Sequence, residues 1–398
     1  MAPIRIALTG LSANSNSSWA ASAHLPYLTS PRGKSKYEVV ALLNSSVSAT
    51  EAAIKNFSLP SGVKAYGDAA ALAADPDVDL VVNSTRSDVH ANSVEPSIRA
   101  GKAVFVEWPL AENYERGAEL VQAQRQGASE RFDDSIIGLQ WQFSPPVQTL
   151  RSLLETGRIG TVLNSSVVFH GMCTKPEVPK VFATFFDRKI GGNSITVEYV
   201  HVINMVHHAI GEWDTETVQS RMSLERPDVA IVYGSSDGKT EVNKVHSDVP
   251  DHLWVNGRLV KGRHEFELAD NATLAVEFST YGAFKGQPSL DLKIAGTKGD
   301  IRVTSHSFAW KWENIQVYDR ETGEVEDIPV GDWAEWQTEL PELTRNTAEL
   351  YERYADWVAN GKPKGSLPQD KEWPRLHDAV VRMKELDLLF KQFDQQRH

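Results

Sequence analysis

Residues 4–10 read IRIALTG, a short apolar run that ends in threonine and glycine. This pattern predicts a buried strand followed by a tight glycine turn. Helical spacing follows from Trp19 to Leu28, and a second apolar strand, YEVVALL, occupies residues 37–43. Strand, glycine turn, helix and strand in this order are typical of the opening of a dinucleotide-binding Rossmann domain.

The same alternation of strands and helices continues to about residue 140. Further strands are predicted at 79–83, 103–107 and 135–140, and further helices at 48–57, 93–100 and 116–125. Near-continuous apolar strands separated by helices indicate a doubly wound parallel sheet with both faces covered. Ser48 and Glu51 are spaced as a capping box at the start of the first of these helices.

The pattern changes from about residue 161 onward. Alternating apolar and polar residues, which are typical of strands with one buried face, occur at 162–169, 229–233, 273–278, 289–294 and 301–303. The turn at 296–300 predicts a hairpin. We therefore expect residues 1–140 to form an α/β Rossmann domain. Residues 141–398 are expected to form a C-terminal, mostly antiparallel open-sheet α+β domain that ends in helices near 343–360 and 373–393.

The composition of the 398 residues is that of a soluble globular protein, with 41% hydrophobic and 24% charged residues. The formal net charge of −12, without a compensating Lys/Arg-rich stripe, disfavours direct binding to nucleic acid. No apolar run is long enough to cross a bilayer and no signal peptide is recognisable, so we expect a cytoplasmic protein without a membrane partner. The single cysteine, Cys173, excludes an internal disulfide and a thiolate metal cluster, and we expect no bound metal.

The first glycine turn departs from the usual Gly-x-Gly-x-x-Gly pattern. Only Gly10 remains of the glycines, and the loop that leads to Trp19 is long and rich in Ser and Asn. Hydroxyl groups beside a helix start, such as those of Ser12 and Ser18, suit phosphate oxygens. We predict that this loop holds the pyrophosphate of a dinucleotide, and a solvated polar loop is the alternative.

Asn44 follows the second strand, where an acidic residue normally accepts hydrogen bonds from the adenosine ribose. An uncharged side chain removes the repulsion against a 2′-phosphate, and Ser45 adds a hydroxyl group next to it. Because no arginine stands beside them, we expect either NADP or NAD as the cofactor.

Residues 106–111 read VEWPLA, and with the motifs around them they resemble the Gfo/Idh/MocA oxidoreductase family, in which this strand ends in Glu-Lys-Pro. Further matches follow in order at 23–25, 79–82, 88–90, 157–160, 191–192, 201 and 295–299. The resemblance implies a Rossmann domain, a larger open-sheet domain, and a homodimer or higher oligomer formed through that sheet. Within the family the chain resembles the fungal galactose-repressor branch, whose repressor binds a dinucleotide yet represses transcription by holding an activator protein.

The resemblance also assigns catalytic positions. The family places proton transfer on the lysine of Glu-Lys-Pro and on an Asp and a His four residues apart. The lysine position is Trp108 here, the aspartate position is Val197, and His201 alone retains the family residue. Glu198 precedes His201 by three residues, a spacing that allows it to orient the imidazole. The predicted catalytic set is therefore His201, Glu198 and Trp108; the alternatives are a core role for His201 and a space-filling role for Trp108.

The predicted cofactor-binding residues come from the first turn and from the ends of successive strands. They are Gly10, Ser12, Ser18, Trp19, Asn44, Ser45, Ser84, His90, Glu107, Trp108 and Gln140.

Three functions are compatible with these residues. The first is an NAD(P)-dependent oxidoreductase with an altered active site that acts on a sugar-like or other small hydroxyl or carbonyl substrate. The second is a non-catalytic regulator that binds the dinucleotide and an activator protein, in which case the protein is expected in the nucleus as well. The third is a family scaffold with non-redox chemistry. The retained His201 favours the first, and the missing lysine favours the second.

Overall fold

The computed structural model describes residues 2–12, 18–127, 134–172, 177–234, 240–262, 264–363 and 367–396, so that Cys173 and residues 13–17 of the first loop lie outside the described residues. The chain divides into two compact units. The first unit comprises Met1–Gln140, Lys189–Gly191 and Ala334–Lys384, and the second comprises Trp141–Arg188, Gly192–Trp333 and Glu385–His398.

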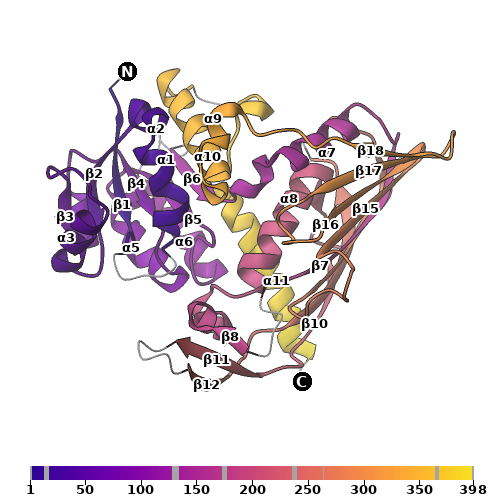
Figure 1. The fold of residues 1–398 in the computed structure, drawn as a ribbon, viewed down its shortest axis with the longest axis horizontal. Coiled ribbons are helices and arrows are strands. Elements are labelled where there is room, and N and C mark those ends of the chain that lie inside the picture. Colours follow the sequence, from indigo (N-terminus) through magenta and orange to yellow (C-terminus); the bar gives the residue numbers. More distant parts are fainter. Residues whose placement is uncertain are drawn as a thin grey trace. The chain divides into compact units, whose positions relative to one another are not determined.

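The first unit is built on a six-stranded sheet in which every neighbouring pair of strands is parallel (Figure 1). Its order is β3-β2-β1-β4-β5-β6, so the direction of winding reverses between β1 and β4. The strands are β1 (Ile4–Thr9), β2 (Tyr37–Leu43), β3 (Lys64–Tyr66), β4 (Leu80–Asn83), β5 (Ala103–Glu107) and β6 (Ser135–Gly138). The predicted doubly wound parallel sheet is confirmed, and β4, β5 and β6 are buried at every position.

Helices connect these strands. They are η1 (Ala20–His24), α1 (Leu25–Thr29), α2 (Pro31–Lys36), α3 (Val47–Asn56), α4 (Ala69–Ala73), α5 (Ser87–Arg99) and α6 (Tyr114–Gly127). The expected capping box of Ser48 is wrong. Ser46 caps α3 instead, because its extended backbone lets the hydroxyl accept a hydrogen bond from the Ala49 amide at 3.1 Å.

The helix α10 (Glu342–Ala359) groups with the first unit, although we expected residues 141–398 to form one C-terminal domain. Aromatic side chains explain this grouping. Tyr351 of α10 stacks on Tyr27 with ring centroids 5.4 Å apart, and the Tyr37 hydroxyl donates to the Tyr351 carbonyl at 2.6 Å. Around α10 lie α9 (Glu335–Thr338), η6 (Gln369–Lys371) and the first part of α11 (Leu376–Gln396).

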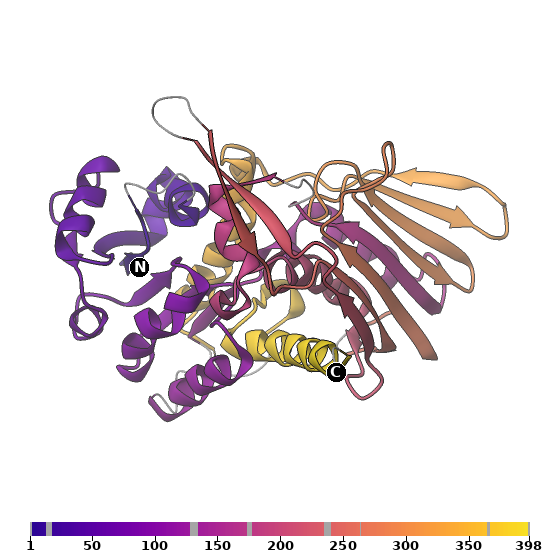
Figure 2. The same ribbon diagram turned by 90° about the horizontal axis from the view of Figure 1, so that it is seen from below.

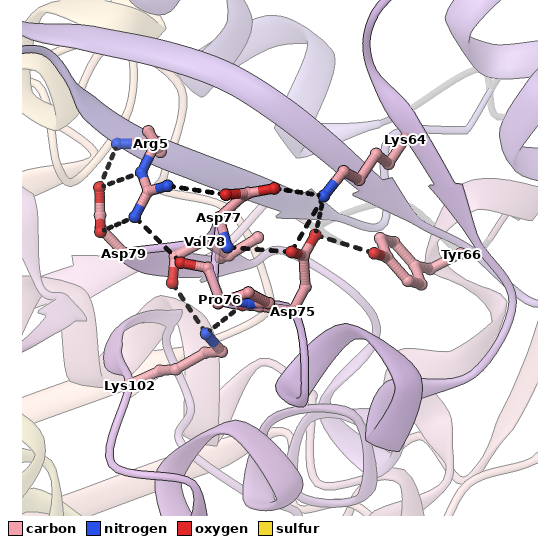
Figure 3. A network of polar contacts seen from close by, with 9 residues as sticks. All are labelled: Arg5, Lys64, Tyr66, Asp75, Pro76, Asp77, Val78, Asp79 and Lys102. Carbon is pink, nitrogen blue, oxygen red and sulfur yellow. Dashed lines mark hydrogen bonds and ion pairs between the residues drawn. The ribbon is translucent and has the colours of Figure 1, made fainter.

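The amino edge of the parallel sheet is tied together by an ionic network (Figure 3). Three cations converge on the segment 75–79, which precedes β4. Arg5 binds Asp79 through two nitrogens, Lys64 contacts both oxygens of Asp75 at 3.0 Å, and Lys102 donates to the carbonyls of residues 75 and 78. The network is structural, and it leaves the opposite, carboxyl edge of the sheet for function.

The second unit contains a nine-stranded sheet of order β10-β13-β14-β7-β15-β16-β17-β18, with β9 paired to β13. Its strands run side by side in Figure 2, and all pairs are antiparallel except β14 with β7. They are β7 (Val162–His170), β9 (Glu212–Trp213), β10 (Gln219–Ser223), β13 (His252–Val260), β14 (Leu268–Ser279), β15 (Leu290–Gly296), β16 (Gly299–Ser305), β17 (Asn314–Asp319) and β18 (Val325–Ile328). Alternate residues of β13 are buried and exposed, which confirms the open sheet, and β15 and β16 form the predicted hairpin.

Helices of the second unit are η2 (Gln140–Phe143), which continues from the first unit, α7 (Pro145–Glu155), η3 (Lys180–Phe186), η4 (Arg188–Ile190), η5 (Ile195–Tyr199) and α8 (Val200–Ile210). The predicted strand at 229–233 does not join the large sheet. It forms a separate three-stranded sheet of β8 (Glu177–Pro179), β11 (Asp228–Gly234) and β12 (Thr240–His246), because Val178, Val229 and Ile231 make a small apolar core of their own. Among the described residues, no helix combines the length and apolarity that a bilayer crossing requires.

Candidate cofactor and active site

The carboxyl edge of the parallel sheet gathers most of the predicted cofactor residues. Gly10 follows β1, Asn44 follows β2, Ser84 follows β4 and Trp108 follows β5. Because all six strands are parallel, these positions lie along one edge, and the winding reverses between β1 and β4. Ligands of doubly wound sheets bind at this reversal.

Position 10 requires a glycine, because of both its backbone conformation and its close neighbours. Its φ is +91°, and a Cβ atom at this position would lie 2.6 Å from the carbonyl oxygen of Ser84. The turn after β1 therefore packs directly against the turn after β4. Ser18 supports the same turn, since its hydroxyl donates to the Gly10 carbonyl at 3.4 Å, and the half-buried Trp19 leads into η1.

Asn44 links the turn after β2 to the turn after β1. Its side-chain nitrogen donates to the carbonyl of Leu11 at 2.9 Å, and its backbone nitrogen donates to the hydroxyl of Thr50 at 3.1 Å. The neighbouring Ser45 is exposed, and Ser12 is half-buried. The side-chain oxygen of Asn44 is an acceptor that suits a ribose hydroxyl, and the Ser45 hydroxyl suits a phosphate oxygen.

Several buried polar atoms at this edge and at the start of η1 have no hydrogen-bond partner within the described residues. They are Oγ1 of Thr9, Nε1 of Trp19, Oγ of Ser84, and both the oxygen and the nitrogen of the Gln140 side chain. Gln140 is only 1% exposed. A buried polar group without a partner costs about 1–3 kcal/mol, and native proteins keep few of them unless a ligand or water completes the set.

Glu107 is the last residue of β5, and Trp108 follows it. The Glu107 carboxylate is buried, with Oε1 2.9 Å from Nε2 of His24. A Cβ on Gly138 would lie 2.4 Å from Oε2 of Glu107, so the absence of a side chain at Gly138 leaves room for the carboxylate. The Trp108 side chain is buried and precedes a cis peptide bond to Pro109.

His90 lies behind this turn. Its Nδ1 is 2.7 Å from the carbonyl oxygen of Pro109, and its Nε2 is 2.8 Å from that of Thr85. Burial lowers the pKa of His90, so the neutral ring donates to one of the two carbonyls at a time. These contacts fix the turn after β5, and direct contact of His90 with a cofactor stays a prediction.

Glu198 is a buried residue of η5 in the second unit, and its carboxyl group contacts Gly171 and Met172, which follow β7. Burial raises its pKa to about 7, against hydrogen bonds from the Met172 amide and the Ser194 hydroxyl. Its Oε2 has no hydrogen-bond partner among the residues that the structure describes. This oxygen lies close to Gly171, since a Cβ atom at Gly171 would be only 2.3 Å from it. Ser194 also lines a cavity of about 280 Å³ beside the small sheet.

His201 is half-buried in the first turn of α8, and Val197 stands in η5 just before it. Tyr199, between them in sequence, is fully buried and stacks on Phe169 with ring centroids 6.1 Å apart. The predicted catalytic set is thus divided between the units: Trp108 belongs to the first, and Glu198 and His201 belong to the second. Orientation of His201 by Glu198 stays a prediction.

Sequence reasoning missed Thr9, His24 and Tyr351 at this site. Thr9 immediately precedes the glycine turn, and His24 stood in a motif that matched the family, so both had a signal in the sequence. Tyr351 had none, because its contacts join segments more than 300 residues apart. Within the described ranges, no three His, Cys, Asp or Glu side chains are arranged to hold a metal ion.

Two family models match the chain. The model of an oxidoreductase family with an NAD-binding Rossmann fold (GFO_IDH_MocA) matches residues 4–129, and that of the Gal80p C-terminal domain matches residues 145–305. The chain is 31% identical over 257 residues to dehydrogenase aclE of Aspergillus oryzae, covering 64% of this chain and 67% of the relative. It is 22% identical over 427 residues to the galactose/lactose metabolism regulatory protein GAL80 of Saccharomyces cerevisiae, covering 98% and 92%.

Solved structures share the fold. A super-repressor mutant of Gal80p from Saccharomyces cerevisiae superposes with a TM-score of 0.82 at 21% identity, over 100% of this chain and 97% of the other. Levoglucosan dehydrogenase in complex with NADH and levoglucosan superposes with a TM-score of 0.69 at 18% identity, over 99% and 98%.

Proposed function

The chain belongs to the Gfo/Idh/MocA family of NAD-binding oxidoreductases, in its Gal80-like branch, and from this premise we propose that it is an NAD(P)-dependent oxidoreductase with an altered active site. The proposed substrate is a sugar-like or other small molecule with a hydroxyl or carbonyl group. The observation that carries the cofactor assignment is the set of unpartnered buried atoms of Thr9, Trp19, Ser84 and Gln140. A dinucleotide lying across the reversal in strand order would supply partners for them.

The residues at the carboxyl edge of the parallel sheet have the hydrogen-bonding groups that a dinucleotide needs. The amide and hydroxyl groups around Gly10 would hold the pyrophosphate, Asn44 and Ser45 the adenosine ribose, and Ser84, Glu107, Trp108 and Gln140 the nicotinamide half. When bound, the dinucleotide supplies the hydride acceptor or donor. NADP and NAD both suit the uncharged pair Asn44 and Ser45, and we propose that NADP binds at least as well as NAD.

Proton transfer is assigned to residues of the second unit. His201 is the family group that remains, and an imidazole titrates near neutral pH. Glu198, whose pKa is about 7, holds or releases a proton in the same range. With tryptophan in place of lysine, Trp108 is proposed to stack on the nicotinamide or on a flat substrate.

A second candidate function is a dinucleotide-binding regulator that holds an activator protein. Two observations favour it: the Gal80p C-terminal model matches residues 145–305, and Trp108 and Val197 replace two of the three proton-transfer groups. Under this proposal the protein acts in the cytoplasm and the nucleus. Either function is compatible with a dimer, which we propose to form through the exposed face of the large sheet around Val168, Trp254 and Tyr318.

One series of measurements tests the proposal. Titration with NAD, NADP and their reduced forms, followed by tryptophan fluorescence, is expected to show saturable binding, and its absence for all four overturns the cofactor assignment. Turnover is then measured with a panel of polyols, ketones and aldehydes. His201→Ala is expected to lower turnover by a factor on the order of 100 to 10,000 while leaving dinucleotide affinity nearly unchanged. Saturable binding without any turnover by the parent protein supports the regulator instead.

A further inference from the structure

Three buried side chains from distant parts of the chain form a continuous polar contact inside the first unit. The Glu107 carboxylate ends β5, His24 ends η1, and Tyr351 lies in α10. Oε1 of Glu107 is 2.9 Å from Nε2 of His24, and Nδ1 of His24 is 2.8 Å from the Tyr351 hydroxyl. His24 and Tyr351 are fully buried, and the edge of the His24 ring packs against Phe105 with centroids 5.1 Å apart.

The hydrogen-bonding capacity of Tyr351 and His24 favours one direction of the contact between them. Burial raises the pKa of Tyr351 well above its ordinary value, so the phenol keeps its proton and is able to donate it to Nδ1 of His24. A neutral imidazole that accepts at Nδ1 carries its proton on Nε2. In this tautomer the Nε2–H group of His24 faces Oε1 of Glu107 at 2.9 Å, a close polar contact that falls outside hydrogen-bond geometry.

The position of the Glu107 carboxylate in the sheet indicates which half of a dinucleotide would lie near it. In a sheet of this order the adenosine half of a dinucleotide lies over the end of β2, where Asn44 stands, so the nicotinamide half lies on the side of β4, β5 and β6. Glu107 ends β5 on that side, and Gly138 of β6 leaves room for its Oε2. The oxidised nicotinamide ring carries a positive charge, whereas the reduced ring is neutral, so a fixed negative charge here acts on the two forms differently.

We propose that the buried carboxylate of Glu107, which His24 and Tyr351 position, makes this protein bind the oxidised dinucleotide in preference to the reduced one. Glu107 is then the residue that determines the redox preference, and His24 and Tyr351 are positioning residues behind it. The inference rests on the proposed cofactor site. It also gives helix α10 a part in cofactor recognition, through the hydroxyl group of Tyr351.

The test compares dissociation constants for NAD⁺ and NADH in the full-length protein and in three variants. Glu107→Gln keeps the size of the side chain and removes its charge, and it is expected to lower the preference for NAD⁺ on the order of tenfold. Tyr351→Phe removes only the hydroxyl that fixes His24, and it is expected to shift the preference in the same direction by a smaller factor. The matched control is Glu352→Gln, which neutralises a buried carboxylate of the same helix that binds Tyr27, Arg32 and Lys36 instead.

The outcomes separate this inference from the function on which it rests. An unchanged preference in folded Glu107→Gln protein, or equal weakening of NAD⁺ and NADH, overturns the inference and leaves the cofactor site standing. If thermal unfolding shows that Glu107→Gln does not fold, an unchanged preference in Tyr351→Phe overturns it. A shift in Glu352→Gln as large as that in Glu107→Gln also overturns it. Failure of the parent protein to bind either form overturns the proposed function as well.

Discussion

Buried polar side chains at the two edges of the parallel sheet differ in whether they have hydrogen-bond partners. At the amino edge, Asp75 accepts hydrogen bonds from Lys64, Tyr66 and the Asp77 amide, so both of its oxygens are used. At the carboxyl edge, the Gln140 side chain is equally buried and has no partner within the described part of the chain. Since the strands are the same, we attribute the difference to the proposed cofactor site: the amino edge stabilises the fold, and the polar groups of the carboxyl edge are proposed to bind the ligand.

Glu198 is a buried polar group of the second unit that also lacks a partner, within the described residues, for one of its oxygens. Its titration is expected to have the largest effect among these predictions, a change of the unfolding free energy with pH. Burial raises its pKa to about 7 from an ordinary value of 4.5, so the folded state holds a proton that the unfolded state has released between these values. Stability is therefore fully present below about pH 4.5 and falls as pH rises through about 7, by roughly 3 kcal/mol in total. Urea unfolding across this range measures it. Glu198→Gln is expected to flatten the decline, and an unchanged decline contradicts the assignment.

The second prediction tests whether Gln140, at the carboxyl edge, serves ligand binding or the stability of the fold. Gln140→Leu removes polar atoms that lack protein partners and keeps the volume, so the unfolding free energy is expected to stay the same or rise. Affinity for the dinucleotide is expected to fall on the order of 10- to 100-fold, since the bound cofactor loses a hydrogen-bond partner. Fluorescence titration and thermal unfolding measure the two quantities.

Gln337→Leu is the matched control for this prediction. Gln337 is a buried glutamine of the same unit whose oxygen accepts from the Ala334 amide and whose nitrogen donates to the Arg345 carbonyl. Its replacement is expected to destabilise the protein by about 1–2 kcal/mol and to leave the affinity unchanged. If Gln140→Leu behaves like Gln337→Leu, the two edges do not differ as proposed.

The difference between the edges also marks how far the sequence alone predicts this molecule. Periodicity predicted the parallel sheet and the open sheet, and the position of Asn44 and Glu107 at strand ends follows directly from it. Contacts between segments that are distant in the sequence could not be predicted from it. The grouping of α10 with the first unit depends on Tyr351 packing against Tyr27, and periodicity carries no information on such a pair. Whether Gln140 has a partner likewise depends on what surrounds it in space.

The smallest expected effect concerns the amino edge and tests its structural role. Burial raises the pKa of Asp75, but hydrogen bonds from the Asp77 amide, Lys64 and Tyr66 outweigh it and place the pKa below its ordinary value. A lowered pKa means that this contribution to stability is present above about pH 4 and is lost as pH falls through the folded-state value. Asp75→Ala is expected to cost roughly 1–2 kcal/mol at neutral pH and to make the acid-side loss of stability shallower.

The control for Asp75→Ala is Asp88→Ala, which breaks an exposed ion pair with Arg86 in the same unit. Exposed pairs contribute about 0–1 kcal/mol, so the control is expected to change the unfolding free energy less. Dinucleotide affinity is expected to be unchanged in Asp75→Ala, because the network lies at the edge opposite the proposed cofactor site. A loss of affinity at constant stability would show that the amino edge contributes to binding, and the contrast between the two edges would then fail.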